Sequence, residues 1–273
     1  MKKDLKDVTF IIPIRIESKD RMRNVVTVLC YLLSNFETKV ILKEVDRESV
    51  FKQYVLPQVI EYLDGDVSNL HHIFEESDPD DPMFYRMRYL NEMIHMSETE
   101  IVSNYDTDVL LPRMSYLEAQ EMIMCGTYDV VYPYGKGIWQ KKINATDEMV
   151  SDFLSNDCDF SYLEKNFEPD NAESGHVQFI RRSSYIGAGM ENENFISYSP
   201  EDKERIHRFG LLGYNVGRID DTVYHLEHAR TPNSWITNPY MKQNFELWDY
   251  LKGLSREELT QYYQEQKYLK KYK

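Results

Sequence analysis

The sequence is poor in cysteine and has no surplus of positive charge. Its 273 residues include three cysteines, Cys30, Cys125 and Cys158, which are widely spaced and form no CxxC pair. An odd, scattered set of this kind argues against a disulfide framework and a structural zinc site. Aspartate and glutamate number 46 against 32 lysines and arginines, which gives a formal net charge of −14. Binding nucleic acid through its phosphates needs the opposite sign, so we exclude nucleic acid as a partner.

The sequence also lacks a long apolar run near its start. Residues 8–14 are apolar, but the run contains Pro13 and is too short for a membrane-spanning helix or the apolar region of a signal peptide. We therefore expect a cytoplasmic protein. Apolar residues make up 42% of the chain and charged residues 29%, a balance typical of a globular protein.

Strand and helix patterns alternate through the first half of the chain. Apolar runs without polar alternation predict strands buried on both faces, and apolar residues at helical spacing predict helices between them. The expected strands cover residues 8–14, 39–42, 70–74 and 100–105, and the expected helices cover residues 22–36, 51–63 and 83–94. The second helix should bend or break at Pro57. This order predicts an α/β fold with a mostly parallel central sheet and helices on both faces. Such sheets bind ligands beyond the carboxyl ends of their strands.

The alternation loosens in the second half of the chain. Residues 129–132 and 176–180 predict strands, and the polar, acidic stretch 144–174 between them is either an insertion or an acceptor-side lobe. After residue 238 the sequence turns helical, with a capping box formed by Ser255 and Glu258.

The strongest local signal is Asp106-Thr107-Asp108, which follows the expected strand 100–105. In extended backbone, residues two apart point to the same side, so the two carboxylates should converge. Paired carboxylates at a strand end attract a hard divalent cation such as Mg²⁺ or Mn²⁺. The alternative interpretation is an acidic turn that only closes the strand.

Two further clusters follow it along the chain. The segment Ser199-Pro200-Glu201-Asp202 suits a helix N-terminus, where its carboxylates serve either as helix caps or as a general base. His225 and His228 follow a predicted strand, where they either bind one metal ion or have a structural role.

The order of these pieces resembles the GT-A glycosyltransferases. Within that group, the chain is similar to the galactosyltransferase-like members of family 2 and to the β-1,4-galactosyltransferases. The resemblance runs from about residue 8 to residue 233, and the combination is specific although no single piece is. The matching pieces are residues 10–15, 88–91, 106–108, 187–195, Glu201-Asp202 with Arg205, and one of the two histidines.

The resemblance implies a role for each matching residue. Donor-binding roles fall on Pro13, Ile14 and Arg15 at the first strand end, Glu44 or alternatively Asp46 at the second, Arg88 and Asn91 on a helix, and Asp106. Asp106 and Asp108 match the metal motif, with Asp108 the more direct ligand, and one of His225 and His228 matches a metal-binding histidine. Asp202 matches the catalytic base. Glu201 matches an acceptor-binding carboxylate, and Tyr198, a second expected acceptor contact, stands where the family has tryptophan.

These roles together imply an inverting, metal-dependent glycosyltransferase with Mn²⁺ or Mg²⁺ as cofactor. It would move a hexose, galactose favoured, from a UDP-sugar such as UDP-galactose to a hydroxyl of a glycan or lipid-linked glycan. One alternative is a sugar nucleotidyltransferase, but the segment after the first strand lacks the glycine-rich loop usual in that class. The other alternative is a non-catalytic sugar-binding protein on the same fold.

The resemblance also implies a division of the chain. We expect a GT-A domain over residues 1–235, with a nucleotide-sugar half over about 1–112 and an acceptor half over 113–235. A helical extension should follow over residues 236–273. Its last residues include Lys267, Lys270, Lys271 and Lys273 beside aromatic residues. Such a cluster suits peripheral contact with an anionic inner membrane face, the alternative being a solvated terminal helix.

Overall fold

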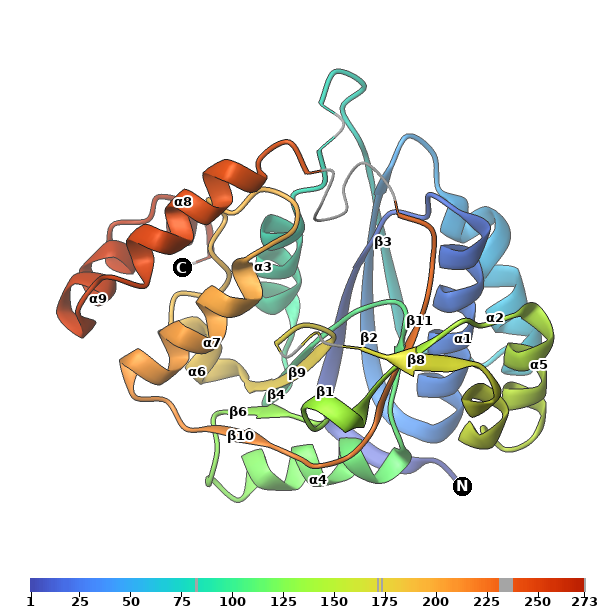
Figure 1. Cartoon of the computed structure of the whole chain (residues 1–273). Coiled ribbons are helices and arrows are strands. Elements are labelled where there is room, and N and C mark those ends of the chain that lie inside the picture. The colour runs from blue at the N-terminus through green and yellow to red at the C-terminus, as the bar shows by residue number, and fades with distance from the viewer. Residues whose placement is uncertain (82, 171, 173, 231–237, 273) are drawn as a thin grey trace.

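The centre of the protein is a seven-stranded sheet, seen in a computed structural model that describes residues 1–272 except 82, 171, 173 and 231–237 (Figure 1). Its strands, in spatial order, are β10 (Val216–Arg218), β6 (Val130–Tyr132), β9 (Val177–Arg181), β4 (Ile101–Tyr105), β1 (Lys3–Ile14), β2 (Phe36–Asp46) and β3 (Leu70–Glu76). Neighbouring strands are parallel except at β9, which runs antiparallel to both β4 and β6. The predicted mostly parallel sheet is confirmed.

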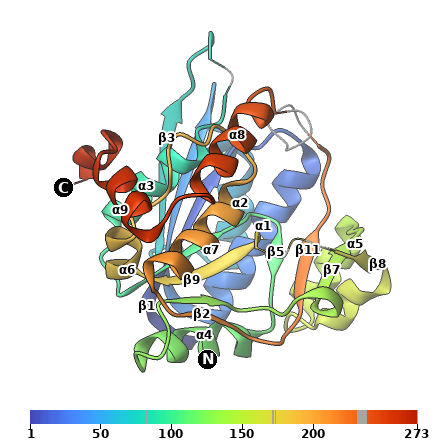
Figure 2. The same ribbon diagram turned by 60° about the vertical axis from the view of Figure 1, so that its left-hand side comes forward.

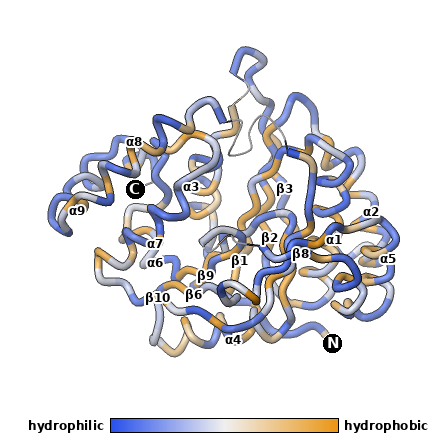
Figure 3. Tube along the Cα trace, viewed as in Figure 1, coloured by the Kyte–Doolittle hydropathy of each residue, from blue (hydrophilic) through white to orange (hydrophobic). Residues whose placement is uncertain are grey.

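Helices cover both faces of this sheet. In Figure 1, α1 (Lys19–Asn35) and α2 (Leu56–Tyr62) lie on one side of the central strands, and α3 (Arg86–Met96) and α7 (Glu201–Leu212) lie on the other. The short helix α6 (Arg182–Gly187) follows β9, and α4 (Arg113–Met124) packs against β1 and β6. Figure 3 shows that the apolar residues concentrate along the sheet strands. The core therefore lies between the sheet and its two helix layers.

A smaller sheet positions part of the second half of the chain. Its order is β5 (Val109–Leu110), β11 (Val223–Leu226), β7 (Gln140–Ile143) and β8 (Phe167–Pro169). The acidic stretch between the two later predicted strands forms α5 (Asp147–Ser155), the 3₁₀ turn η3 (Phe160–Lys165) and β8. The 3₁₀ turn η2 (Gly137–Trp139) leads into β7. Because β11 pairs with β5, His225 lies opposite Val109, next to the end of the Asp-Thr-Asp segment.

Two predicted helices differ in detail from the structure. The helix expected over residues 51–63 is broken, as predicted, into a π-helical segment η1 (Phe51–Val55) and α2. Pro57 lies in the first turn of α2, the position at which proline is best tolerated in a helix. The helix expected from residue 83 begins instead at Arg86.

The C-terminal residues form helices that pack on the rest of the protein. Helices α8 (Met241–Leu251) and α9 (Arg256–Gln264) contact α7, and the terminal 3₁₀ segment η4 (Tyr268–Tyr272) contacts α3 (Figure 2). The predicted capping box at Ser255 is confirmed. Tyr268 is buried, and the Tyr272 hydroxyl donates a 2.8 Å hydrogen bond to Glu193 Oε1. Among the described residues, no helix is both long and apolar enough to cross a membrane.

Candidate active site

A cavity of about 220 Å³ opens where β1 and β4 reach their carboxyl ends. This is the sheet edge at which parallel α/β sheets bind ligands. Residues from several separate segments line it: Pro13, Ile14, Arg15, Arg21, Asp106, Asp108, His176, Tyr198, Asp202, His225, His228 and Arg230. The structure therefore brings together most of the site residues expected from the sequence.

Asp108 forms a compact group with both histidines. Its Oδ2 lies 3.0 Å from His228 Nε2 and 3.9 Å from His225 Nε2, and one ligand atom from each of the three residues lies within 4.8 Å of the others. Burial opposes ionisation of Asp108, but the hydrogen bond from His228 and the charge of His225 outweigh it and hold the pKa of Asp108 well below its usual range. A carboxylate with two imidazoles is a donor set that binds divalent metal ions. Asp108, His225 and His228 thus form a group that could hold a metal ion.

Hydrogen bonds on the far side of each imidazole orient its ring. His225 Nδ1 lies 2.9 Å from Asp170 Oδ2, and His228 Nδ1 lies 2.9 Å from the backbone oxygen of Ala229. Both Nδ1 atoms therefore act as donors, and both Nε2 atoms face Asp108. Metal-binding histidines are usually held in this way, with one ring nitrogen bonded to a carboxylate or carbonyl and the other on the ion.

Asp106 does not join this group. Strand β4 ends at Tyr105 and the chain turns before β5, so the extended backbone assumed for Asp106 to Asp108 is interrupted. The expected extended backbone across this segment is therefore wrong, although both carboxylates line the same cavity. Asp106 Oδ1 instead accepts a 2.7 Å hydrogen bond from Arg86, which is 4% exposed. Burial raises the pKa of Asp106, although Arg86 acts in the opposite direction.

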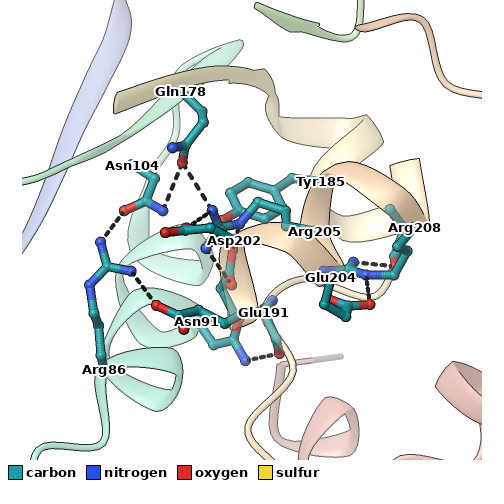
Figure 4. A network of polar contacts seen from close by, with 12 residues as sticks. Arg86, Asn91, Asn104, Gln178, Tyr185, Glu191, Asp202, Glu204, Arg205 and Arg208 are labelled. Carbon is teal, nitrogen blue, oxygen red and sulfur yellow. Dashed lines mark hydrogen bonds and ion pairs between the residues drawn. The ribbon is translucent and has the colours of Figure 1, made fainter. Parts of the chain in front are cut away.

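Asp202 stands in the first turn of α7 and is held by a buried network (Figure 4). Arg205 Nη1 donates to Asp202 Oδ1 at 2.6 Å and to Gln178 Oε1 at 3.1 Å. The same guanidinium forms a two-point ion pair with Glu191, at 2.6 and 2.9 Å. A side chain added at Gly175 would lie 3.4 Å from Asp202 Oδ2. One carboxylate oxygen is thus fixed by Arg205, and the other lies beside the glycine that lines the cavity.

Glu201 and Tyr198 lie next to Asp202. Glu201 is 3% exposed, and burial, followed by the charge of Asp202, raises its pKa to about 8. Its Oε2 has no hydrogen-bond partner among the residues that the structure describes. The Arg86 guanidinium lies 5.7 Å from the centre of the Tyr198 ring. Burial therefore favours the neutral acid form of Glu201, and its Oε2 is a buried oxygen whose hydrogen-bonding capacity is unsatisfied.

Comparison with known proteins bears on the fold. The sequence matches no family model and no curated protein. The structure of S. aureus TarS residues 1–349 is similar with a TM-score of 0.50 and 16% identity, over 83% of this chain and 60% of that chain. The mannosyltransferase PcManGT from Pyrobaculum calidifontis, in complex with GDP-Man and Mn²⁺, is similar with a TM-score of 0.53 and 13% identity, over 96% of this chain and 69% of that chain. The chain has the GT-A fold. The predicted fold class is confirmed, and this chain spans about three-fifths of the TarS chain.

Three residues expected to bind the donor lie elsewhere in this GT-A fold. Glu44 is fully buried and accepts hydrogen bonds from the Ser49 hydroxyl at 2.5 Å and from the Phe51 backbone at 2.8 Å. Arg88 pairs with Glu75 and Glu92 on the surface of α3. Asn91 is buried and binds the backbone of Glu191 through both of its amide atoms. Neither these residues nor Asp46 is among the described residues that line the cavity.

Other residues that line or support the cavity were missed from the sequence. His176 lies there because β9 is antiparallel to β4, which brings the start of β9 to the end of β4, and Asp106 N donates to His176 O at 3.0 Å. Burial lowers the pKa of His176 to about 4, so its ring is neutral. Arg21 stands in the first turn of α1, directly after the first strand. The strand-end rule points to this position, and its positive charge was the overlooked signal.

Proposed function

We propose that the chain is an inverting, metal-dependent glycosyltransferase that moves a hexose from a nucleotide-diphosphate donor to a hydroxyl of a glycan. The observation that carries the proposal is one cavity on a GT-A fold that is lined by both a possible metal-ligand group and a fixed carboxylate. The first is Asp108 with His225 and His228, and the second is Asp202.

The metal-ligand group fits a divalent cation, and Mn²⁺ better than Mg²⁺. Mg²⁺ prefers oxygen ligands throughout, whereas Asp108, His225 and His228 offer one carboxylate and two imidazoles. When bound there, the cation supplies Lewis-acid stabilisation of the negative charge that develops on a departing diphosphate. PcManGT, the similar mannosyltransferase, is in complex with Mn²⁺, which supports the same choice for this chain.

Three arginines line the cavity beside its carboxylates, on a strongly acidic protein. Arg15, Arg21 and Arg230 line it, and guanidinium groups bind phosphate oxygens through paired hydrogen bonds. We assign the donor phosphates to these side chains and the nucleotide to the strand end at Pro13 and Ile14. The resemblance favours UDP-galactose, while the GDP-Man held by the mannosyltransferase makes a guanosine donor the second choice.

Asp202 is the proposed base. Its position on α7 is fixed by Arg205, and the same side chain lines both the cavity and the larger groove next to it. A hydroxyl arriving from the groove would donate its proton to Asp202 as its oxygen attacks the anomeric carbon. Attack from the side opposite the leaving diphosphate is a single displacement, which inverts the anomeric configuration.

Nucleotide release tests the proposal directly. The full chain would be incubated with Mn²⁺ and with UDP-galactose, UDP-N-acetylgalactosamine, UDP-glucose or GDP-mannose, and the released diphosphate measured. We expect Mn²⁺-dependent release from one of them, loss of release in Asp108→Ala, and a fall of about 10²–10⁴-fold in Asp202→Asn with donor affinity little changed. Full activity of Asp108→Ala in EDTA would refute the metal role. Pyrophosphate formation from a nucleoside triphosphate and a sugar 1-phosphate would identify a nucleotidyltransferase instead.

A further inference from the structure

A groove of about 900 Å³ adjoins the active-site cavity, and residues from α7 and α8 form part of its wall. Tyr198, Gly175 and Asp202 line both spaces, so the groove leads to the proposed base. The two helices lie side by side in both Figure 1 and Figure 2. Helix α8 belongs to the segment expected from the sequence to be an extension of the catalytic domain, yet Trp248 of this helix lines the groove.

Two polar atoms in the groove wall are buried without a partner. Glu201 Oε2 and His207 Nε2 accept or donate no hydrogen bond within the part of the chain that the structure describes. Glu201 is 3% exposed, so its unpaired oxygen is costly unless a ligand satisfies it. The two residues lie on α7, six positions apart, and both line the groove. A ligand with several hydroxyl groups along its length would satisfy both atoms.

The rest of the wall combines aromatic and aliphatic side chains with two serines, Asp202 and a lysine. The Trp248 and His207 rings pack edge to face, with centroids 5.4 Å apart, and Pro200 and Ile206 also line the groove. Trp248 is neither fully buried nor fully exposed, so part of its indole surface is accessible. A pyranose ring has a face of C–H groups that packs on an indole and a rim of hydroxyls that bind polar atoms. An aromatic wall with a few unpaired polar atoms therefore matches carbohydrate better than it matches a purely apolar or a charged ligand.

We propose that this groove binds the second sugar unit of a glycan acceptor, with Trp248 as a stacking surface and Glu201 and His207 as hydroxyl-binding groups. The proposal rests on the proposed function, because the reacting sugar would lie at Asp202 and the groove would hold the unit next to it. The raised pKa of Glu201 agrees with this role, since a neutral carboxylic acid both donates to and accepts from hydroxyl groups. The protein thus selects acceptors of at least two sugar units.

Binding of matched sugars to the full chain tests this selection. Isothermal titration in the presence of UDP and Mn²⁺ would compare glucose with cellobiose, galactose with galactobiose, N-acetylglucosamine with chitobiose, and mannose with mannobiose. We expect at least one disaccharide to bind about tenfold more tightly than its monosaccharide, equivalent to about 1.4 kcal/mol. Trp248→Ala should remove that gain and leave the monosaccharide affinity unchanged. Trp248→Phe should keep most of the gain.

Control variants separate a lost binding surface from a damaged helix. Tyr250→Ala removes an aromatic residue of the same helix that is 56% exposed and does not line the groove, so the gain should persist. If the alanine variant does not fold, Trp248→Leu replaces it, because leucine keeps an apolar side chain on α8. This variant should also lose the gain in disaccharide affinity. The proposal is overturned if none of the four disaccharides binds more tightly than its monosaccharide. It is also overturned if the Trp248 variants lose monosaccharide and disaccharide affinity equally. A Trp248-dependent gain in disaccharide affinity, in a protein that releases no nucleotide from any donor, would support the groove as a sugar-binding site and refute the glycosyltransferase function.

Discussion

Replacing Arg205 by methionine should impair both folding and turnover, whereas the same change at Arg208 should impair folding alone. Both guanidinium groups are fully buried on α7, one turn apart. Arg205 bonds Glu191 at two points and Asp202 at one. Arg208 bonds Glu204 at two points, at 2.9 and 3.2 Å, and the backbone oxygen of Ala188 at 2.6 Å. The pair differs in that only Arg205 contacts the proposed base.

The stability cost should be similar for the two variants. Removing one partner of a buried ion pair leaves the other charge uncompensated, at a cost of about 3–5 kcal/mol. In a chain of this size, each kcal/mol lowers Tm by about 2–4 °C, so a fall of about 6–20 °C is expected for each variant. The turnover cost should differ. Without Arg205, Asp202 loses the bond that fixes its Oδ1, and a base displaced by about 1 Å slows the reaction by roughly 10²-fold.

Thermal unfolding and nucleotide release measured on the same preparations separate the two effects. Turnover would be expressed per folded molecule and at a temperature well below both Tm values. Arg205→Lys adds a second comparison, because it keeps the charge without the planar fork and should recover stability more than turnover. Equal turnover losses in the Arg205 and Arg208 methionine variants would show that Arg205 is only structural. Unchanged turnover in Arg205→Met would show that Asp202 does not need Arg205 to hold its position.

Three further predictions concern the metal site, Glu201 and the C-terminus. Mn²⁺ at about 100 times its Kd should stabilise the wild type by about 2.7 kcal/mol in thermal unfolding and should not stabilise Asp108→Ala. An equal rise in Tm for both proteins would contradict the metal site. Because the pKa of Glu201 is raised to about 8 from an ordinary 4.5, its stabilising contribution is complete below pH 4.5 and is lost as pH rises through 8. In urea unfolding, the free energy of unfolding of Glu201→Gln should therefore rise relative to that of the wild type between pH 5 and 9. Parallel plots of the two free energies against pH would refute this. Truncation after Gln266 removes the buried Tyr268 and should lower Tm. If the truncated and full chains co-sediment equally with anionic vesicles at low salt, the membrane contact predicted from the sequence is rejected.

Much of the fold could be predicted because its strands are buried on both faces. The segment from Val8 to Ile14 reads as a strand for that reason, and the structure places it next to the middle of the sheet, as part of β1. The periodicity of apolar residues does not predict strand direction. Nothing local in residues 177–181 distinguishes a parallel strand from the antiparallel β9, since direction is decided by the connections and by pairing with β4 and β6. His176 was missed as a consequence.

The site was predictable where chemistry follows directly from a strand end. Asp108 and Asp202 stand out as carboxylates after a strand and at a helix start, and the structure places both at the cavity. Residues on the donor-side helix were harder, because only half a helical turn separates opposite faces. Arg86 faces the cavity residue Asp106, while Arg88, two residues later, faces Glu75 on the other side. A helix rotates by about 100° per residue, so an alignment error of two positions exchanges a site residue for a surface residue.

The two sides of the cavity are joined by one buried network, which explains why β9 matters for the chemistry. Gln178 of β9 accepts from Asn104 of β4 and from Arg205 of α7, each at 3.1 Å, and its amide nitrogen donates to the backbone oxygens of Ser174 and Gly175. Asn104 in turn accepts from Arg86, the partner of Asp106. A buried network of this kind is stable only when every member is satisfied, so its members hold one another in a single arrangement. The distance between the strand end that carries Asp106 and the helix start that carries Asp202 is therefore set by the core of the protein.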